Sequence, residues 1–256
     1  MLQHPVIEKL HQLRLKTMAN TLKLQQDQPE VDGLSFEERL SLLIDIEITE
    51  RDNRRLQTRL RKAKLKHTAC FEDIDYQTKR GLDKALLSKL ALCQWIRGSQ
   101  NVLIVGPCGT GKTFLACALA HKACLSGFTS AYYRLHRLLP DLGVSKGDGR
   151  YSKFIDELAK VDVLILDDFG LAPFTDEHRQ DLLEVLDDRI EKRATIVTSQ
   201  LPVKLWHETI GNGTLADAIL DRLVHNAHRF ELTGDSMRKT KQKNVTSSLT
   251  ESGIVL

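Results

Sequence analysis

Short apolar runs and amphipathic stretches alternate along most of this 256-residue chain. Runs rich in β-branched or aromatic residues lie at 102–105, 131–133, 162–167 and 195–199. Stretches with apolar positions at helical spacing lie between and after them, at 112–125, 135–142, 151–159 and 176–192. This alternation predicts an α/β fold in three layers, with a mostly parallel sheet that helices cover on both faces.

The chain before this alternation shows helical patterns alone. Residues 5–26 place apolar side chains at helical spacing and predict one helix. Ser35-Phe-Glu-Glu38 has the form of a capping box, which predicts the start of a long helix that runs to about Lys66. We therefore predict a small all-α domain over residues 1–67. The predicted organisation continues with a linker over 68–80, a core over 81–237 and a polar tail over 238–256.

A phosphate-binding motif separates the first predicted strand of the sheet from the helix that follows. The motif G-x-x-x-x-G-K-[ST] is formed by Gly106, Pro107, Cys108, Gly109, Thr110, Gly111, Lys112 and Thr113. Its glycines let the backbone turn sharply and point N–H groups inward, and the helix that continues through Phe114 adds its positive end. Because the strand–loop–helix setting is the one the motif requires, residues 106–114 are predicted to bind ATP. The alternative is a chance match in an ordinary strand–helix turn.

Four side chains around this loop are candidates for the chemistry of hydrolysis. Lys112 is predicted to reach the β- and γ-phosphates, and Thr113 to ligate a Mg²⁺ that bridges them. The predicted strand 162–167 ends in a Walker B pattern of two carboxylates. We predict that Asp167 holds the Mg²⁺ through water and that Asp168 orients or deprotonates the attacking water. The alternative is that both carboxylates only cap the turn that follows.

The last predicted strand of the sheet also ends in polar residues. Thr198, Ser199 and Gln200 stand at its carboxyl end, where the strands of a parallel sheet present groups to a ligand. One of the three is predicted to probe the γ-phosphate or the attacking water, with Ser199 and Gln200 as the catalytic candidates. Which one acts is left open, and the alternative is an ordinary polar turn before Pro202.

Composition excludes some classes of protein. Apolar residues make up 41% of the chain and charged residues 28%, which is typical of soluble proteins. No apolar run approaches the roughly 18 residues of a membrane span, and the N-terminus lacks the layout of a signal peptide. The 5 cysteines form no C-x-x-C pair, so we predict reduced packing residues and neither a disulfide framework nor a zinc site. These features predict a cytoplasmic protein without a membrane partner.

Positive charge gathers at the end of the long predicted helix. Between Arg51 and His67 the only acid is Asp52, and the basic residues are Arg51, Arg54, Arg55, Arg59, Arg61, Lys62, Lys64 and Lys66. Several recur at spacings of three and four, which places them on one helix face. A face of this kind suits the phosphates of nucleic acid, and these residues are the predicted DNA contacts. The alternative is a solvated helix face.

Several segments resemble one protein family, in the order in which they occur. They are Leu13–Ala19, Leu34–Leu40, Phe71–Tyr76, the phosphate loop, Leu164–Gly170, Thr198–Pro202 and Ala218–Leu223. On these segments the chain resembles the IstB family, the helper ATPases of bacterial insertion sequences, from about residue 5 to about residue 240. The resemblance implies an AAA+ P-loop NTPase of the clade that includes the DnaC helicase loader and the DnaA initiator.

The resemblance also implies roles for residues outside the phosphate loop. In that clade the Arg of the Leu-Asp-Arg-Leu segment reaches the γ-phosphate held by a neighbouring subunit, and the matching residue is Arg222. The alternative is an arginine that pairs with Asp221 or Asp217 on its own helix. The linker would lie near the adenine, unless it only packs on the core. Asp168 stands where many AAA+ proteins have Glu, which implies slow turnover, and we expect no C-terminal helical lid and assign no second sensor arginine.

The function implied is that of a transposition helper. Such a protein binds ATP, forms a homo-oligomer on duplex DNA with little sequence preference, and recruits its partner transposase, while hydrolysis dismantles the assembly. The first alternative is a DnaC-like loader of a replicative helicase, which would favour single strands. The second is a metabolic P-loop kinase, for which neither a substrate pocket nor a closing lid is evident in the sequence.

Overall fold

The chain divides into two compact units. The computed structural model describes residues 5–26 and 33–237, so the predicted polar tail lies outside the described residues. Contacts within the chain separate Met1–Thr58 from Arg59–Leu256, whereas the sequence placed the boundary after residue 67. The division falls inside one long helix.

The first unit consists of helices, as predicted, but its first helix is broken. Its helices are α1 (Pro5–Gln12), α2 (Lys16–Gln26) and α3 (Phe36–Ala63). The single helix predicted over 5–26 is wrong because the backbone turns at Arg14, which has a φ of 60°. The Leu15 N–H donates to Leu10 O at 2.8 Å. This hydrogen bond is typical of a helix that ends just before a residue with left-handed backbone, as α1 ends before Arg14. Arginine takes a position that glycine usually occupies, so the sequence carries no signal for this break.

Side-chain caps begin two of these helices. The predicted capping box is confirmed, because Ser35 N–H donates to the Glu38 carboxylate at 2.8 Å and Glu38 N–H donates to Ser35 Oγ at 3.3 Å. The buried Glu47 of α3 accepts from Met18 N–H at 2.9 Å and from Arg51 Nε at 2.9 Å. Burial raises the Glu47 pKa, but these hydrogen bonds outweigh it and hold the pKa below its usual value. The carboxylate thus satisfies a free N–H in the first turn of α2.

The second unit is built on a parallel sheet. Its strands are β1 (Asn101–Val105), β2 (Ser130–Arg134), β3 (Val163–Phe169), β4 (Ala194–Ser199) and β5 (Ala227–Glu231). They lie in the order β2-β3-β4-β1-β5, and every pair is parallel. The four predicted strands are confirmed. The strand β5 was not predicted, because Phe230 is its one buried residue and its pattern of apolar positions is weak.

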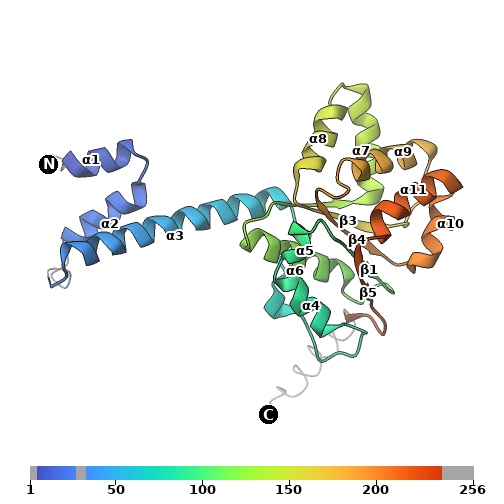
Figure 1. Cartoon of the computed structure of the whole chain (residues 1–256), viewed down its shortest axis with the longest axis horizontal. Coiled ribbons are helices and arrows are strands. Elements are labelled where there is room, and N and C mark those ends of the chain that lie inside the picture. The colour runs from blue at the N-terminus through green and yellow to red at the C-terminus, as the bar shows by residue number, and fades with distance from the viewer. Residues whose placement is uncertain (1–4, 27–32, 238–256) are drawn as a thin grey trace, which may run out of the picture. The chain divides into compact units, whose positions relative to one another are not determined.

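Helices cover both faces of the sheet (Figure 1). One face carries α4 (Lys84–Ala91), α5 (Gln94–Arg97) and α6 (Lys112–Leu125). The other carries α7 (Leu135–Gly147), α8 (Tyr151–Lys160), α9 (Asp176–Asp187), α10 (Trp206–Ile210) and α11 (Gly213–Val224). Alternate residues of each strand enter opposite cores, as Ile104 and Leu103 do in β1. The predicted three-layer fold is therefore confirmed.

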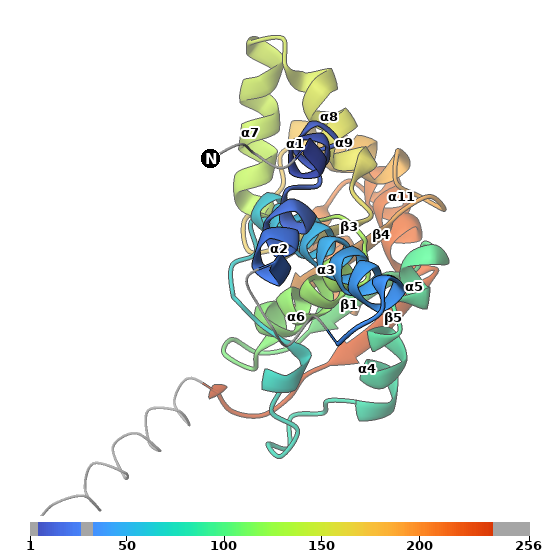
Figure 2. The same ribbon diagram turned by 90° about the vertical axis from the view of Figure 1, so that its left-hand side faces the viewer.

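The helices α7 and α8 lie side by side and form a hairpin at one end of the second unit (Figure 2). No helix follows β5 among the residues that the structure describes. None of the described helices combines the length and the apolar character that a membrane crossing needs.

A buried arginine joins the end of α8 to the amino end of β4. The helix predicted over 176–192 ends at Asp187, and Arg189, 1% exposed, turns inward just beyond it. Its guanidinium donates to four acceptors: Leu158 O at 2.6 Å, Val161 O at 2.7 Å, Ala194 O and Thr195 Oγ1. Burial lowers the pKa of Arg189 to about 9, so the side chain stays charged at neutral pH. A cation thus satisfies carbonyls at the end of α8 that its own helix cannot pair.

We expect Arg189→Met to destabilise the second unit by about 3 kcal/mol or more, because each buried acceptor left unpaired costs about 1–3 kcal/mol. Both tryptophans, Trp95 and Trp206, are buried in this unit, so urea unfolding followed by their fluorescence reports on it. The matched control is Arg193→Met, which removes a partly exposed ion pair with Asp162 and should cost less than about 1 kcal/mol. Equal losses in the two variants would contradict this role of Arg189.

Candidate nucleotide-binding site

The phosphate loop joins β1 to α6 at the carboxyl ends of the strands. Gly106 has a φ of 146°, and a Cβ at this position would lie 2.2 Å from Leu232 O. Gly111 precedes the first turn of α6 with a φ of 93°, and a Cβ there would lie 2.5 Å from an Arg80 nitrogen. Both positions therefore require glycine for conformation and for space. Cys108, predicted as a packing residue, is exposed on this loop.

Lys112 begins α6 and lies close to the loop. Its Nζ donates to Pro107 O at 2.8 Å, and its side chain is mostly buried. Burial lowers the Lys112 pKa, and the nearby Cys108, Asp168 and Asp167 partly offset this. The ammonium thus stands within the loop with a single hydrogen bond to a backbone carbonyl, a contact that a phosphate oxygen can replace.

Asp167 is the centre of the site. Its carboxylate is fully buried and accepts hydrogen bonds from three hydroxyl groups. Thr113 and Thr198 donate to Oδ1 at 2.8 and 2.5 Å, and Tyr132 donates to Oδ2 at 2.5 Å. Lys66 adds a positive charge 3.6 Å from Oδ2. Burial raises the Asp167 pKa, but the hydroxyl donors and Lys66 outweigh it, so the pKa is held below its usual value and the group stays ionised.

These groups fit a magnesium ion held together with a nucleotide. Thr113 Oγ1 and Asp167 Oδ1 are hard oxygen donors that already lie within 2.8 Å of each other beside the phosphate loop. The described residues hold no cluster of three or more His, Cys, Asp or Glu side chains that could form a cage made of protein alone. Mg²⁺ usually takes one or two protein ligands and completes its shell with phosphates and water. The donor set therefore suits Mg²⁺ better than a structural metal.

The backbone changes conformation at Asp168, next to the buried Asp167. The pairing of β3 with β4 shifts between Leu166 and Phe169, and Asp168 has a φ of 63°. Left-handed backbone is uncommon outside glycine, and it often marks functional positions. The Asp168 N–H donates to Thr198 Oγ1 at 3.2 Å. Asp168 borders a small hollow of about 40 Å³ that His136 also lines. Asp168 is partly exposed, whereas Asp167 is fully buried.

The three polar residues at the end of β4 have different surroundings. Thr198 contacts both Asp167 and the backbone of Asp168. The Ser199 hydroxyl donates to Phe169 O at 2.8 Å and accepts from Leu201 N–H at 3.1 Å, so backbone groups use it on both sides. Gln200 is exposed. Of the three, Thr198 is the one that the structure places in contact with both carboxylate residues.

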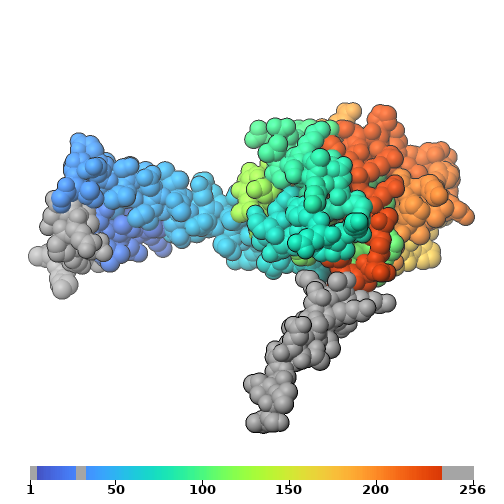
Figure 3. All heavy atoms as spheres, turned by 90° about the horizontal axis from the view of Figure 1, so that it is seen from below, coloured from blue at the N-terminus to red at the C-terminus, as the bar shows by residue number. Residues whose placement is uncertain are grey.

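The linker predicted over 68–80 reaches the phosphate loop from one side. Arg80 is 4% exposed and donates to Thr110 O at 2.9 Å and to Asp75 O at 3.0 Å. The segment after β5 runs beside it, because Thr233 N–H donates to Arg80 O and Met237 N–H donates to Gly109 O, both at 2.9 Å. Figure 3 shows the two segments together on the surface, in teal and red. Two stretches far apart in the sequence thus support the loop.

Arg222 lies at the opposite end of the sheet from the phosphate loop. Asn101, the first residue of β1, donates to Arg222 O at 2.8 Å, whereas the loop follows the last residue of this strand. A strand of this length separates the two by about 15 Å. The Arg222 side chain pairs with Asp187 of α9 and donates to Ala218 O, and it contacts neither Asp221 nor Asp217. Arg222 borders a hollow of about 430 Å³.

The residues predicted to contact DNA fall into three groups. Ion pairs within the helix involve Arg51 with Glu47, Arg54 with Glu50, and Arg55 with Asp52. Two other residues bind within the second unit: Arg59 donates to Cys124 O at 3.0 Å, and Lys66 faces Asp167. The exposed residues Arg61, Lys62 and Lys64 form no ion pair with any described residue. Two of the acids that pair with these residues, Glu47 and Glu50, precede the basic run. The positive charge of the run is therefore neutralised more than its own composition indicates.

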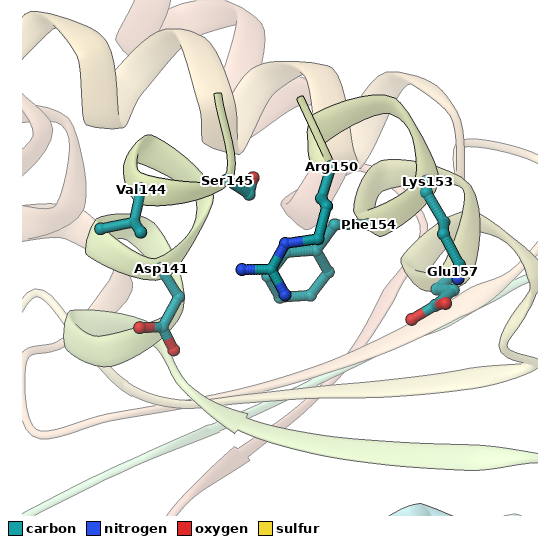
Figure 4. Close-up of a pocket in the computed structure, with 7 residues that line it drawn as sticks. All are labelled: Asp141, Val144, Ser145, Arg150, Lys153, Phe154 and Glu157. Carbon is teal, nitrogen blue, oxygen red and sulfur yellow. The ribbon is translucent and has the colours of Figure 1, made fainter. Parts of the chain in front are cut away.

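A further hollow of about 390 Å³ lies between α7 and α8. Figure 4 shows the Arg150 side chain extending from the start of α8 toward Asp141 and Ser145 of α7. Acidic residues Asp141 and Glu157 and the basic Lys153 complete much of its polar lining. No residue of the phosphate loop lines this hollow, and its opposite charges favour no one class of ligand.

Sequence patterns missed three residues of the site. Tyr132 was part of a predicted strand, Arg80 of a linker, and Lys66 of a basic helix face, and each contacts a group more than 25 positions away. A tyrosine in a strand next to the Walker B strand is a signal that could have indicated a donor to Asp167. The contacts of Lys66 and Arg80 depend on the path of the loops and leave no local pattern.

The sequence matches one family, described as IstB-like ATP binding protein, over residues 8–245. A protein of Sinorhizobium fredii named as an insertion sequence ATP-binding protein is 49% identical over 95% of this chain and 99% of its own length. A counterpart from Pseudomonas fluorescens is 50% identical over 79% of this chain and 87% of its own length. One from Mycobacterium tuberculosis is 35% identical over 93% of this chain and 96% of its own length.

Solved structures share the fold at low identity. The crystal structure of DnaI matches with a TM-score of 0.56 and 22% identity, over 65% of this chain and 92% of that protein. DnaA from Aquifex aeolicus bound to AMPPCP matches with a TM-score of 0.54 and 21% identity, over 75% of this chain and 58% of that protein. Together with the relatives and the loop geometry, these matches lead to one conclusion. The chain belongs to the family of IstB-like ATP-binding proteins and has the AAA+ P-loop fold.

Proposed function

We propose that this protein hydrolyses ATP in the presence of Mg²⁺ and uses the cycle to assemble on duplex DNA and recruit a partner transposase. The observation that carries the proposal is the buried Asp167 carboxylate, which three hydroxyl groups hold beside Thr113 and the phosphate loop. Burying a charge in this way is costly unless a cation or reaction uses it. The names of the relatives, all insertion sequence ATP-binding proteins, support the part of the proposal that concerns transposition.

Each residue of the site has a proposed role in hydrolysis. Lys112 exchanges its bond to Pro107 O for the phosphates, and the loop amides bind their oxygens. Mg²⁺, when bound, would supply positive charge beside the phosphates, and Thr113 and Asp167 would hold it. Asp168, which is partly exposed and borders a hollow, is proposed to orient the attacking water. Aspartate is shorter than the glutamate at this position in many AAA+ proteins, so we propose slow turnover.

Thr198 is proposed as the residue that senses the state of the site. It donates to the Asp167 carboxylate and accepts from the backbone N–H of Asp168, so it links the proposed metal ligand to the backbone of the residue proposed to orient the water. Ser199 and Gln200 remain as alternatives, although backbone partners already engage the Ser199 hydroxyl.

We expect Thr198→Val to lower the steady-state ATPase rate by about 10–100-fold, the usual cost of losing a group that orients a metal ligand. Ser199→Ala and Gln200→Ala are the matched controls, and each should stay within a few-fold of the wild-type rate. Phosphate release in excess Mg·ATP measures all three. A larger loss in either control than in Thr198→Val would transfer the sensing role to that residue.

Arg222 is proposed to act on the ATP of a neighbouring subunit, since it lies about 15 Å from its own phosphate loop. We expect Arg222→Ala and Lys112→Ala each to abolish hydrolysis, because an arginine at the transition state is worth about 10³–10⁵ in rate. A mixture of the two variants should recover activity, because one supplies an intact ATP site and the other an intact arginine.

The control for this mixing experiment is Asp187→Ala, which removes the partner of the Arg222 side chain within its own subunit. It should keep hydrolysis, because Asp187 only holds the resting arginine. A mixture that stays inactive, together with an inactive Asp187→Ala, would show that the Arg222–Asp187 pair is structural.

For the DNA part, we expect tight binding to duplex DNA only with Mg·ATP, with Lys112→Ala failing to bind under the same conditions. Fluorescence anisotropy with duplex and single-stranded oligonucleotides of the same sequence measures this. A clear preference for single strands would favour a helicase loader, and no binding to either would contradict both functions.

The exposed basic residues that pair with no acid among the described residues test where the DNA lies. Changing Arg61, Lys62 and Lys64 together to alanine should weaken binding and lower the slope of log affinity against log salt by roughly 2–3. The matched control changes Arg54 and Arg55, which already pair with acids on α3. Equal effects in both variants would make the whole basic run the contact surface.

A further inference from the structure

Lys66 lies in the ATP site and not on an open basic face. Its Nζ is 3.6 Å from Oδ2 of Asp167, and its side chain is 25% exposed while that of Asp167 is 0% exposed. Among the described residues it is the one basic side chain that forms an ion pair with this carboxylate. The lysine thus adds a positive charge beside the carboxylate that the three hydroxyl groups stabilise.

The segment around Lys66 is fixed to the helix that carries the phosphate loop. The flanking Ala63 and Ala69 are fully buried, and Leu65 packs on the core that includes α6. The His67 ring lies 6.4 Å from the ring of Phe114, which follows Thr113 in α6. This packing holds the Lys66 backbone beside α6, so the ammonium reaches Asp167 because its segment is docked there.

A divalent cation bound by the same carboxylate competes with this lysine. Two cations within a few ångströms repel each other strongly where little water screens them, and Asp167 is buried. The Lys66 head is partly exposed, so it has a route to solvent while its backbone stays near the core. Metal and lysine are therefore alternative counter-ions of one charge.

We propose that Lys66 is a built-in counter-ion of Asp167 that Mg·ATP displaces, so that loading of the site releases Lys66 and loosens residues 64–67. The proposal deepens the proposed function, on which it rests, because it needs Mg²⁺ at this carboxylate. Linkage makes the effect reciprocal: whatever draws Lys66 away from Asp167 strengthens the binding of Mg·ATP by the same factor. Lys66 acts on the site through Asp167, so it is a positioning residue.

The test compares ATP affinity with and without the metal. A fluorescent ATP analogue is titrated into wild type and Lys66→Met, in excess Mg²⁺ and in EDTA, and the two Kd values give a ratio for each protein. We expect the ratio of the EDTA value to the Mg²⁺ value to rise about tenfold in Lys66→Met, within the usual range of coupling between sites. In Lys66→Met, Mg·ATP displaces no cation, so it should bind more tightly. Metal-free ATP meets the Asp167 charge without the lysine, so it should bind more weakly.

Matched variants make this result specific. Lys66→Arg keeps the charge and should keep the wild-type ratio, and Lys160→Met removes an exposed charge on α8, outside the nucleotide-binding site, and should leave the ratio unchanged. Lys66→Gln repeats the measurement if Lys66→Met folds poorly. Hydrogen exchange supplies a second readout: peptides that cover residues 64–67 should exchange faster in wild type with Mg·ATP than with ATP and EDTA.

Two outcomes overturn the inference alone. An unchanged ratio in a wild type that binds Mg·ATP would show that Lys66 does not compete with the metal. An equal loss of affinity in both buffers would show that Lys66 binds the nucleotide itself. If wild type bound ATP in neither buffer, the proposed function would fail first, and the inference with it.

Discussion

The site depends on keeping one buried carboxylate ionised. Asp167 has no exposed surface, and a charge in that position is unfavourable unless donors surround it. The donors come from four parts of the chain: Thr113 from the first turn of α6, Tyr132 from β2, Thr198 from β4 and Lys66 from the segment after α3. The order of the sheet makes this possible, because β3 lies between β2 and β4 and brings both neighbours to the same carboxylate. The strand order is thus a chemical requirement as well as a packing solution.

Much of the second unit follows from local patterns. The runs that enter two cores, the glycines of the phosphate loop and the Walker B carboxylates are all adjacent in sequence, so spacing alone identifies them. The same local logic fails where one residue takes an unusual backbone. Arg14 ends α1 in a conformation that glycine favours, and Asp168 bends β3 without any change in its apolar pattern. The strand β5 was not predicted for a different reason, because Phe230 is its one buried residue.

Partners of charged side chains were harder to predict. Counting charges between residues 51 and 67 left out Glu47 and Glu50, which lie one helical turn earlier and pair with Arg51 and Arg54. Arg189 falls inside the helix predicted over 176–192, and no local pattern indicates that it satisfies backbone carbonyls from α8 and β4. Such contacts join positions that only the tertiary structure brings together, and a long flexible side chain can reach several of them. A charge pattern therefore shows which charges a segment carries, but it does not show which residues those charges contact.

The parallel sheet gives the subunit two unlike ends. The phosphate loop stands at the carboxyl ends of the strands and Arg222 near their amino ends, beside Asn101. A contact in which the arginine of one copy meets the loop of the next joins different surfaces, so it is heterologous and leaves one unmatched surface at each end of a row of copies. Such rows close into a ring only when the rotation between neighbours divides a full turn, and otherwise they grow as a helix. A two-fold dimer would need a surface other than the ATP site, because its two copies meet through the same surface.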